Sequence, residues 1–261
     1  MTARPTHLTA ENAAAFREQG VVDLYHLRLP YPREVFDILT GLTMGEPLSV
    51  LDVGAGAGAG ELARPLAGRA NRVDAVDISE AMVKKGRTMP GGNHPHLRWI
   101  VLSVETAELW PPYSLITAGD SMHWMDWEVV FPRFREILTP RGLVTIVHRD
   151  EPDPPWQADL MQLIRHYSTM RNYQPFDLIT ELEQRGLFLV AGKHETAPVS
   201  TQQSVEDYVA SFHSRSSLSR RRMPSADVAA FDHQLRELVE PWSSAGMLDL
   251  QTVASVVWGV P

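Results

Sequence analysis

The chain has 261 residues, which suits one large α/β domain or a core domain with a small addition. Hydrophobic residues make up 44% of it, and this share excludes wholesale disorder. The formal net charge of −8 argues against a general nucleic-acid binder, and the lack of cysteine excludes disulfides and thiolate chemistry.

Neither a targeting segment nor a membrane span is evident in the sequence. Residues 1–16 lack the apolar centre of a secretory signal peptide. No apolar run approaches the roughly 20 residues that a membrane-spanning helix needs. We therefore expect a soluble cytoplasmic protein that does not bind membranes.

Helical patterns alternate with apolar, β-branched runs between residues 31 and 149. We expect helices at residues 31–42, 61–68, 79–87 and 128–142. We expect strands at residues 47–53, 71–77, 97–103, 113–119 and 143–149. Ser79 is the expected N-cap of its helix, and Pro140 and Gly142 are expected to end the last helix. This alternation predicts parallel strands with helices on both faces and a ligand site at the carboxyl ends of the strands.

The regular alternation of helical and strand patterns ends at Arg149. Residues 150–156, "DEPDPPW", read as an acidic, proline-rich linker. Helices are then expected at residues 157–170, 177–186, 204–219 and 229–242, the last of them clearly amphipathic. Two late strands are expected at residues 187–198 and 250–259.

The stretch "VLDVGAGAGAGELA", residues 50–63, is a glycine-rich loop that follows the first strand. Gly54, Gly56 and Ala59 fit the dinucleotide pattern G-x-G-x-x-G/A. Asp52, Gly54, Gly56 and Gly58 fit a different pattern, D-x-G-x-G-x-G. The loop alone does not decide which nucleotide it holds.

Two acidic residues bear on this choice. Asp77 ends the second strand, where a carboxylate can accept two hydrogen bonds from a ribose diol, as either nucleotide requires. Asp52 would be unfavourable beside a pyrophosphate, whereas it would stabilise the ammonium and sulfonium charges of S-adenosylmethionine. Asp52 therefore favours S-adenosylmethionine over a nicotinamide dinucleotide, and we expect it to bind this cofactor. A compatible alternative is that Asp52 caps amides of the loop.

Four segments in order resemble class I S-adenosylmethionine-dependent methyltransferases. "VLDVGAGAG" is similar to the first motif of that family, and "VDAVDISEAMVKKGR" to the second. Residues 113–147 resemble the region from strand four to strand five. "YHLRLPYPREVFDIL" and the C-terminal tail resemble the small-molecule enzymes of the trans-aconitate methyltransferase-like group.

The resemblance implies a set of cofactor contacts. The backbone of residues 54–56 would face the methionine part, Asp77 the ribose, and residues 103–105 the adenine edge. Ser103 stands where this family often has aspartate, so Glu105 is the alternative partner for the adenine amino group. The residues implied at the cofactor are Tyr25, Arg28, Gly54, Ala55, Gly56, Asp77, Ile78, Met82, Ser103, Val104, Glu105 and Ala118.

The resemblance also implies a fold. It is a Rossmann-like α/β sheet of seven mostly parallel strands with the last strand antiparallel, and helical insertions cap the acceptor pocket. Within this single integrated domain, residues 1–45 would form an N-terminal lid and first helix. Residues 46–150 would form the cofactor-binding core, and residues 151–261 the remaining strands and the cap.

Methyl transfer needs positioning and the exclusion of water, and a base only where the acceptor must lose a proton. His123 is the candidate base, although it could instead only shape the pocket, and Asp120 or Asp126 could orient it or cap a helix. The residues expected at the acceptor are Tyr31, His123, Trp124 and Arg215. We expect no metal site, because the "HPH" run at residues 94–96 reads as an exposed connector.

The function expected from these features is methylation of a small molecule, with S-adenosylhomocysteine as the second product. The acceptor atom is expected to be a hydroxyl or carboxylate oxygen. The alternatives are N-methylation of a small amine, a cofactor-binding protein without transferase activity, and an NAD-dependent oxidoreductase. The identity of the acceptor and the oligomeric state lie beyond the sequence.

Overall fold

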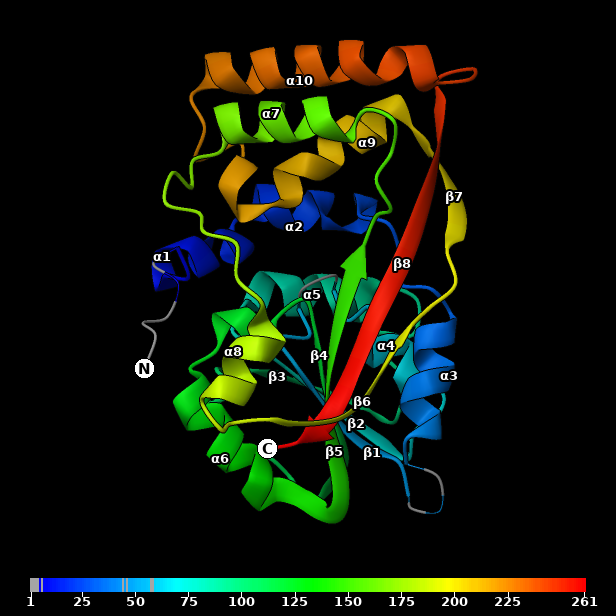
Figure 1. Ribbon diagram of the computed structural model, residues 1–261. Coiled ribbons are helices and arrows are strands. Elements are labelled where there is room, and N and C mark those ends of the chain that lie inside the picture. Colours follow the sequence, from blue (N-terminus) through cyan, green and yellow to red (C-terminus); the bar gives the residue numbers. More distant parts are fainter. Residues whose placement is uncertain (1–4, 6, 44, 46, 57–58) are drawn as a thin grey trace.

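The computed structural model describes residues 5, 7–43, 45, 47–56 and 59–261. In this part of the chain one sheet of eight strands forms the centre of the molecule (Figure 1). The strands are β1 Ser49–Val53, β2 Arg72–Asp77, β3 Leu97–Val101, β4 Tyr113–Gly119, β5 Leu138–Asp150, β6 Leu189–Glu195, β7 Val199–Ser204 and β8 Met247–Val260. Their order is β3-β2-β1-β4-β5-β8-β6, and β7 pairs with β8 off this path.

The first five strands are parallel, as the alternating pattern predicts. The long strand β8 runs antiparallel to both β5 and β6. The Rossmann-like fold with one antiparallel strand is therefore confirmed, although the sheet has eight strands rather than the seven expected. Parallel pairing brings the carboxyl ends of β1, β2, β3, β4 and β5 to one edge of the sheet, where ligands bind in such folds.

Ten α-helices are described around the sheet and above it. They are α1 Ala10–Ala13, α2 Gln19–Leu24, α3 Glu34–Gly41, α4 Ala63–Ala67, α5 Glu80–Thr88, α6 Trp127–Ile137, α7 Gln157–Tyr167, α8 Leu178–Gln184, α9 Val205–Ser211 and α10 Ser225–Val239. Ser79 caps α5 as predicted, because its side chain accepts a hydrogen bond from the amide of Met82. No helix in the described ranges is long and apolar enough to cross a membrane.

The strands bury both of their faces. Val50 of β1 packs into one hydrophobic cluster together with Val35 of α3 and Leu66 of α4. Leu51, the next residue, packs into the other cluster together with Phe131 of α6. Successive strand residues point to opposite faces, so this division gives a sheet covered by helices on both sides.

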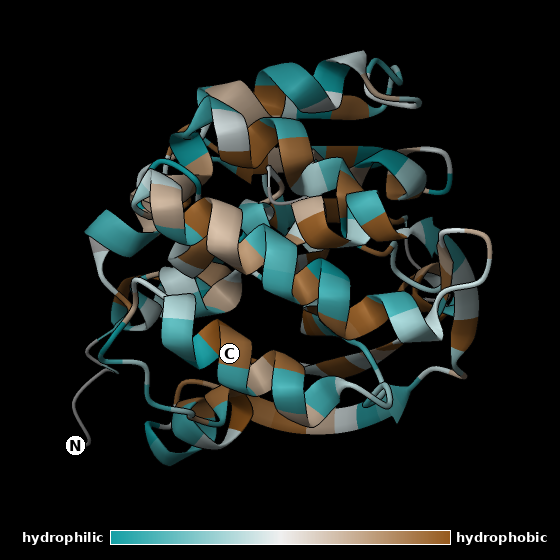
Figure 2. Cartoon of the chain, turned by 90° about the horizontal axis from the view of Figure 1, so that it is seen from above, coloured by the Kyte–Doolittle hydropathy of each residue, from teal (hydrophilic) through white to brown (hydrophobic). Residues whose placement is uncertain are grey.

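A third hydrophobic cluster lies outside the sheet and forms the core of a helical cap. It joins α7, α9 and α10 through buried side chains such as Leu160, Tyr208 and Phe231. The cap stands over the end of the sheet toward which β5 points (Figure 1). Seen from above, its helices carry both hydrophilic and hydrophobic residues, as expected for helices that cover a core (Figure 2).

Three of the expected elements differ from those observed. The helix expected at residues 128–142 ends at Ile137, and Pro140 and Gly142 lie in β5, which already begins at Leu138. The register of β5 against β4 shifts between Tyr113 and Leu115, and this irregularity accommodates the early start. The single helix expected at residues 204–219 is the short helix α9 followed by 3₁₀ turns.

The eighth strand, β7, has no counterpart among the expected elements. Its sequence, "VSTQQS", is mostly polar and carries little apolar signal. It pairs with the first half of β8, whereas the second half of β8 pairs with β5 and β6. The strand therefore depends on the length of β8 rather than on its own hydrophobic pattern.

Candidate functional site

A cavity of about 420 Å³ lies at the carboxyl ends of β1, β2 and β3, and residues 8–17 close one side of it. We call it the glycine-loop cavity, because Gly54 lies on its wall. Gly54 has a φ of +67°, and a Cβ at this position would stand 2.4 Å from Cβ of Ser121. Only glycine fits here, because its φ is positive and the side chain of Ser121 fills the space that a Cβ would take.

Asp77 ends β2 on the wall of this cavity. Its Oδ2 accepts a hydrogen bond from the amide of Gly56 at 2.9 Å, and its Oδ1 accepts one from the amide of Ser79 at 2.6 Å. Burial raises the pKa of Asp77 to about 6, although these two amides favour the charged form. Each carboxylate oxygen keeps a second lone pair, so Asp77 can still accept hydrogen bonds from a ligand.

Apolar side chains form an open slot beside Asp77. Ile78 is 54% exposed and Leu102 is 48% exposed, and both line the cavity together with the fully buried Met82. Exposed aliphatic side chains that line one cavity suit a flat, weakly polar group. Ile78 and Met82, both expected at the cofactor, therefore lie on an apolar part of the cavity wall.

The turn after β3 closes the edge of this slot. Ser103, Val104 and Glu105 all line the cavity, and the hydroxyl of Ser103 donates a hydrogen bond to Glu105. The other carboxylate oxygen of Glu105 accepts a hydrogen bond from the amide of Asp126 at 3.0 Å. Glu105 is thus bonded to the N-cap residue of α6, whose own side chain makes no capping hydrogen bond.

The N-terminal segment is tied to the core and to the cap. The carbonyl of Phe16 accepts a hydrogen bond from the hydroxyl of Ser79 at 2.8 Å. Arg222, from the segment before α10, donates to Glu18 at 3.3 Å and to Oδ1 of Asn12 at 3.0 Å. These contacts hold residues 8–18 over the glycine-loop cavity.

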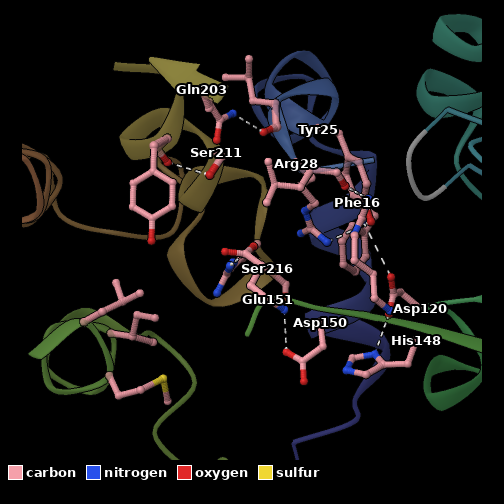
Figure 3. A pocket seen from close by; sticks show the side chains of 18 of the residues that line it. Phe16, Tyr25, Arg28, Asp120, His148, Asp150, Glu151, Gln203, Ser211 and Ser216 are labelled. Atoms are coloured by element: carbon pink, nitrogen blue, oxygen red, sulfur yellow. Dashed lines mark hydrogen bonds and ion pairs between the residues drawn. The ribbon is translucent and has the colours of Figure 1, made fainter. Parts of the chain in front are cut away.

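A second cavity of about 400 Å³ lies under the cap, and we call it the cap cavity (Figure 3). Arg28 lies on its wall and donates to the hydroxyl and the carbonyl of Ser214, each at 2.8 Å, and to the hydroxyl of Tyr25 at 3.0 Å. Arg215 is 4.0 Å from the carboxylate of Glu151 and is 41% exposed. Two guanidinium groups therefore face this cavity, and the hydrogen bonds of Arg28 all go to neutral oxygens.

Asp120 lies where the two cavities meet, directly after β4. Its carboxylate accepts hydrogen bonds from the hydroxyl of Tyr31 at 2.6 Å and from Nδ1 of His148 at 2.7 Å. Burial alone would raise the pKa of Asp120, but the hydrogen bond from His148 and the charge of Arg149 outweigh it and lower the pKa to about 2. Asp120 is therefore ionised at neutral pH.

Arg149 stabilises the charged carboxylate of Asp120. Its guanidinium lies 3.8 Å from Asp120 and 3.0 Å from Glu61, and it stacks over the ring of Tyr31. Burial alone would lower the pKa of Arg149, but the negative charges of Glu61 and Asp120 raise it. The group formed by Tyr31, Glu61, Asp120, His148 and Arg149 is a polar network with each charge next to its opposite.

Trp124 belongs to a 3₁₀ turn, Met122–Trp124, and lines both cavities. It packs edge-on against Phe16, with ring centroids 5.7 Å apart. His123 lines the cap cavity and lies 4.9 Å from the ring of Trp124. Both also line a third cavity of about 680 Å³ beside α8, the side cavity, whose wall includes Tyr173 and Phe176.

Most of the residues expected at a ligand lie on these walls. Those on the glycine-loop cavity are Gly54, Asp77, Ile78, Met82, Ser103, Val104 and Glu105. Those on the cap cavity are Tyr25, Arg28, His123, Trp124 and Arg215. Gly56 donates its amide to Asp77, and Ala55 donates its amide to the carbonyl of Val76, so both belong to the loop itself. Gly58 lies outside the described residues.

Five of the expected contact residues that the structure describes line none of these three cavities, namely Ala55 and Gly56 of the loop and also Asp52, Ala118 and Tyr31. Asp52 is buried behind the loop, where it accepts a hydrogen bond from Thr117 at 2.8 Å, and burial raises its pKa to about 7. Ala118 is fully buried within β4, opposite Ile146. Tyr31 is buried and reaches the site only through Asp120. Asp52, expected to contact the cofactor, therefore lines none of the three cavities.

The histidines of residues 94–96 and the side chain of Arg220 have partners within the protein. His96 bonds to the carbonyl of Ala70, and the amide of His96 bonds to His94. Arg220 lies 3.5 Å from Asp232 on the cap surface. No group of three or more potential metal ligands is found among the described residues.

Three further residues lie at the site although no motif in the sequence marks them, namely Glu61, His148 and Arg149. Glu61 and Asp120 lie far apart in sequence, and only the fold brings them to Arg149. The position of His148 and Arg149 in the sequence does point to the site. They end an expected strand, and ligands bind at the carboxyl ends of parallel strands.

Residues 50–142 match the family model described as a methyltransferase domain. No curated protein matches the sequence significantly. Among solved structures, a protein of Anaeromyxobacter dehalogenans, provisionally assigned as a type II methyltransferase, shares 23% identity with a TM-score of 0.65 and covers 89% of this chain and 96% of its own.

Two further structures have the same fold. A provisionally assigned methyltransferase of Anabaena variabilis from an antibiotic biosynthesis pathway shares 17% identity with a TM-score of 0.56 and covers 88% of this chain and 98% of its own. A provisionally assigned methyltransferase of Bacillus halodurans shares 15% identity with a TM-score of 0.53 and covers 87% and 98%. At such identities these likenesses establish the fold.

Residues 50–142 therefore match a methyltransferase domain, and the chain shares its fold with the three structures above. Gly54 and Asp77, both within the matched segment, lie on the wall of the glycine-loop cavity.

Proposed function

We propose that the chain moves a methyl group from S-adenosylmethionine to an oxygen of a small molecule bound under the cap. The observation that carries this proposal is the junction of the two cavities. Phe16, Asp120 and Trp124 line both the glycine-loop cavity and the cap cavity. A donor in the first cavity and an acceptor in the second would meet at these residues.

The glycine-loop cavity fits S-adenosylmethionine by its chemistry. The free lone pairs of Asp77 suit the ribose hydroxyls, and the slot between Ile78 and Leu102 suits adenine. Gly54 lies on the wall of the same cavity and would face the rest of the ligand. When bound, the cofactor supplies a methyl group that the sulfonium has activated for displacement.

The cap cavity fits a small acidic acceptor. The hydrogen bonds of Arg28 go to Ser214 and Tyr25, and the carboxylate nearest to Arg215 in an ion pair is that of Glu151, 4.0 Å away. Guanidinium groups bind carboxylates in a planar, bidentate manner. His123 and Trp124 form the wall between this pocket and the side cavity, and the cap with residues 8–17 keeps water from the reacting atoms.

A methyl-transfer assay tests this function. The protein is incubated with methyl-labelled S-adenosylmethionine and panels of small carboxylic acids, phenols and amines, and S-adenosylhomocysteine and product mass are measured. We expect turnover with an oxygen acceptor, and Arg215→Gln should raise KM for an acidic acceptor while the exposed Arg221→Gln leaves it unchanged. Turnover of amines alone would favour N-methylation, and binding without turnover of any panel member would favour a cofactor-binding protein.

A further inference from the structure

Asp120 and His148 form a pair at the carboxyl ends of two neighbouring strands. Gly119 of β4 pairs with Val147 of β5, so the residues that follow them, Asp120 and His148, lie side by side. Oδ1 of Asp120 and Nδ1 of His148 are 2.7 Å apart. Figure 3 shows this contact at the margin of the cap cavity.

The conformation of Asp120 is fixed by its surroundings. Its φ is +49°, which is unfavourable for a residue with a Cβ and persists only where neighbouring contacts hold it. These contacts are the hydroxyl of Tyr31, the amide of Arg149 at 3.3 Å, and the bond from its own amide to the carbonyl of Val147. The carboxylate therefore has one orientation, toward His148.

This orientation decides which nitrogen of neutral His148 carries the proton. An ionised carboxylate only accepts hydrogen bonds, so Nδ1 must be the protonated nitrogen. Nε2 then keeps its lone pair. The side chain of His148 is 66% exposed and lines both the cap cavity and the side cavity, so an acceptor in either can reach this imidazole.

We propose that His148 is the proton acceptor of the methyl transfer and that Asp120 is its positioning residue. This inference rests on the proposed function and names the group that takes the proton of a hydroxyl acceptor. His123, the candidate base from the sequence, is the rival for the same task.

The step balances without any further reactant. The acceptor O–H bond breaks, its proton goes to Nε2 of His148, and its electron pair stays on oxygen. The oxygen forms a bond to the methyl carbon while the carbon–sulfur bond breaks, and that electron pair goes to sulfur. The products are a methyl ether or ester and S-adenosylhomocysteine, and the imidazolium, stabilised by Asp120, then releases its proton to water.

The charges around His148 set the direction of the pH dependence. The hydrogen bond to Asp120 raises the pKa of His148 above its usual value, and burial opposes this. The titratable and charged groups that share its cavities are Tyr25, Arg28, Asp120, His123, Arg149, Asp150, Glu151, Tyr208 and Arg215 on the cap side and His7, Tyr173 and Asp177 on the side-cavity wall. Since His148 must be neutral to accept a proton, turnover should fall as the pH drops through this raised pKa.

The tautomer can be tested without an acceptor. Nitrogen-15 NMR of the complete protein with S-adenosylhomocysteine should show neutral His148 protonated at Nδ1, and Asp120→Asn should lower its pKa. A neutral His148 protonated at Nε2 would overturn the proposal, whether or not the protein methylates any compound tested. Failure of methylation with the Nδ1 tautomer present would instead count against the proposed function.

The catalytic role is tested with phenols of graded acidity, from 4-nitrophenol to 4-methylphenol. His148→Gln should lower kcat by about 100-fold or more, most for the least acidic phenol, and should remove the acidic limb of the pH profile. The matched control is His233→Gln on α10, whose side chain is 69% exposed, close to the 66% of His148. Unchanged kcat in His148→Gln, or an acidic limb that only His123→Gln removes, would overturn the proposal.

Discussion

Three aspartates near the ends of neighbouring strands show how strongly position decides charge. Asp52 is buried beside neutral partners, and burial raises its pKa to about 7. Asp77 is buried as well, but two amides limit the rise of its pKa to about 6. Asp120 overcomes the same burial through His148 and Arg149, and its pKa is lowered to about 2. Aspartate is thus a buried residue of β1, a hydrogen-bond partner of the glycine loop and the residue that orients His148.

Asp52→Asn tests this account at the level of stability. The folded-state pKa of Asp52 lies above its unfolded value of about 3.9, so its favourable contribution is present at low pH and is lost as the pH rises through about 7. Asparagine keeps the acceptor for Thr117 and removes the buried charge. We expect the variant to gain unfolding free energy relative to wild type between pH 5 and pH 8, as measured by urea denaturation.

The exposed Asp249→Asn, in the half of β8 that pairs with β7, is the control and should show no such gain. An Asp52→Asn variant that loses stability relative to wild type as the pH rises would contradict the assignment.

At the scale of elements, one arginine, Arg222, makes part of the contact between the N-terminal helices and the cap. Arg222 bonds to Glu18 and Asn12 and to the carbonyl of Glu11, whereas the adjacent Arg221 is exposed. The side chain of Arg222 is only 19% exposed, so solvent screens these contacts less than those of a surface arginine. The segment over the glycine-loop cavity is therefore held from the cap side.

Arg222→Ala should loosen this segment. We expect faster amide hydrogen exchange in residues 7–24 and a several-fold faster release of S-adenosylmethionine, with the sheet unchanged. Arg221→Ala is the matched control. Equal exchange and equal release rates in the two variants would show that Arg222 does not hold the lid.

An element can be predicted from the sequence when its own residues stabilise it, and not when its stability comes from a partner strand. The strands β1, β2 and β4 are nearly all buried, so their apolar runs identify them, and the glycine loop is recognised from its local spacing. The strand β7 is polar and exists through its pairing with β8, which no local pattern reveals. The Asp120–His148 contact joins residues 28 positions apart, so it depends on β4 and β5 being neighbours.

At the scale of the whole molecule, four hydrophobic clusters are described. Two hold helices against the faces of the sheet, the third forms the core of the cap, and the fourth packs α2 and Tyr25 against Met82 of α5. The cavities lie between these bodies, where the carboxyl ends of the strands meet the cap and the N-terminal segment. The sheet supplies the positions of Asp77, Asp120 and His148. The side chains of Asp77 and Asp120 are largely buried there, whereas that of His148 is exposed.

Calorimetric titration of the protein with S-adenosylmethionine tests the central claim most directly. We predict binding to wild type and to the control Asp249→Ala, on the order of 100-fold weaker binding to Asp77→Ala, and none of NAD. Thermal melting of each variant verifies that it is folded. Binding of NAD without S-adenosylmethionine, or wild-type affinity for S-adenosylmethionine in Asp77→Ala, would contradict the account.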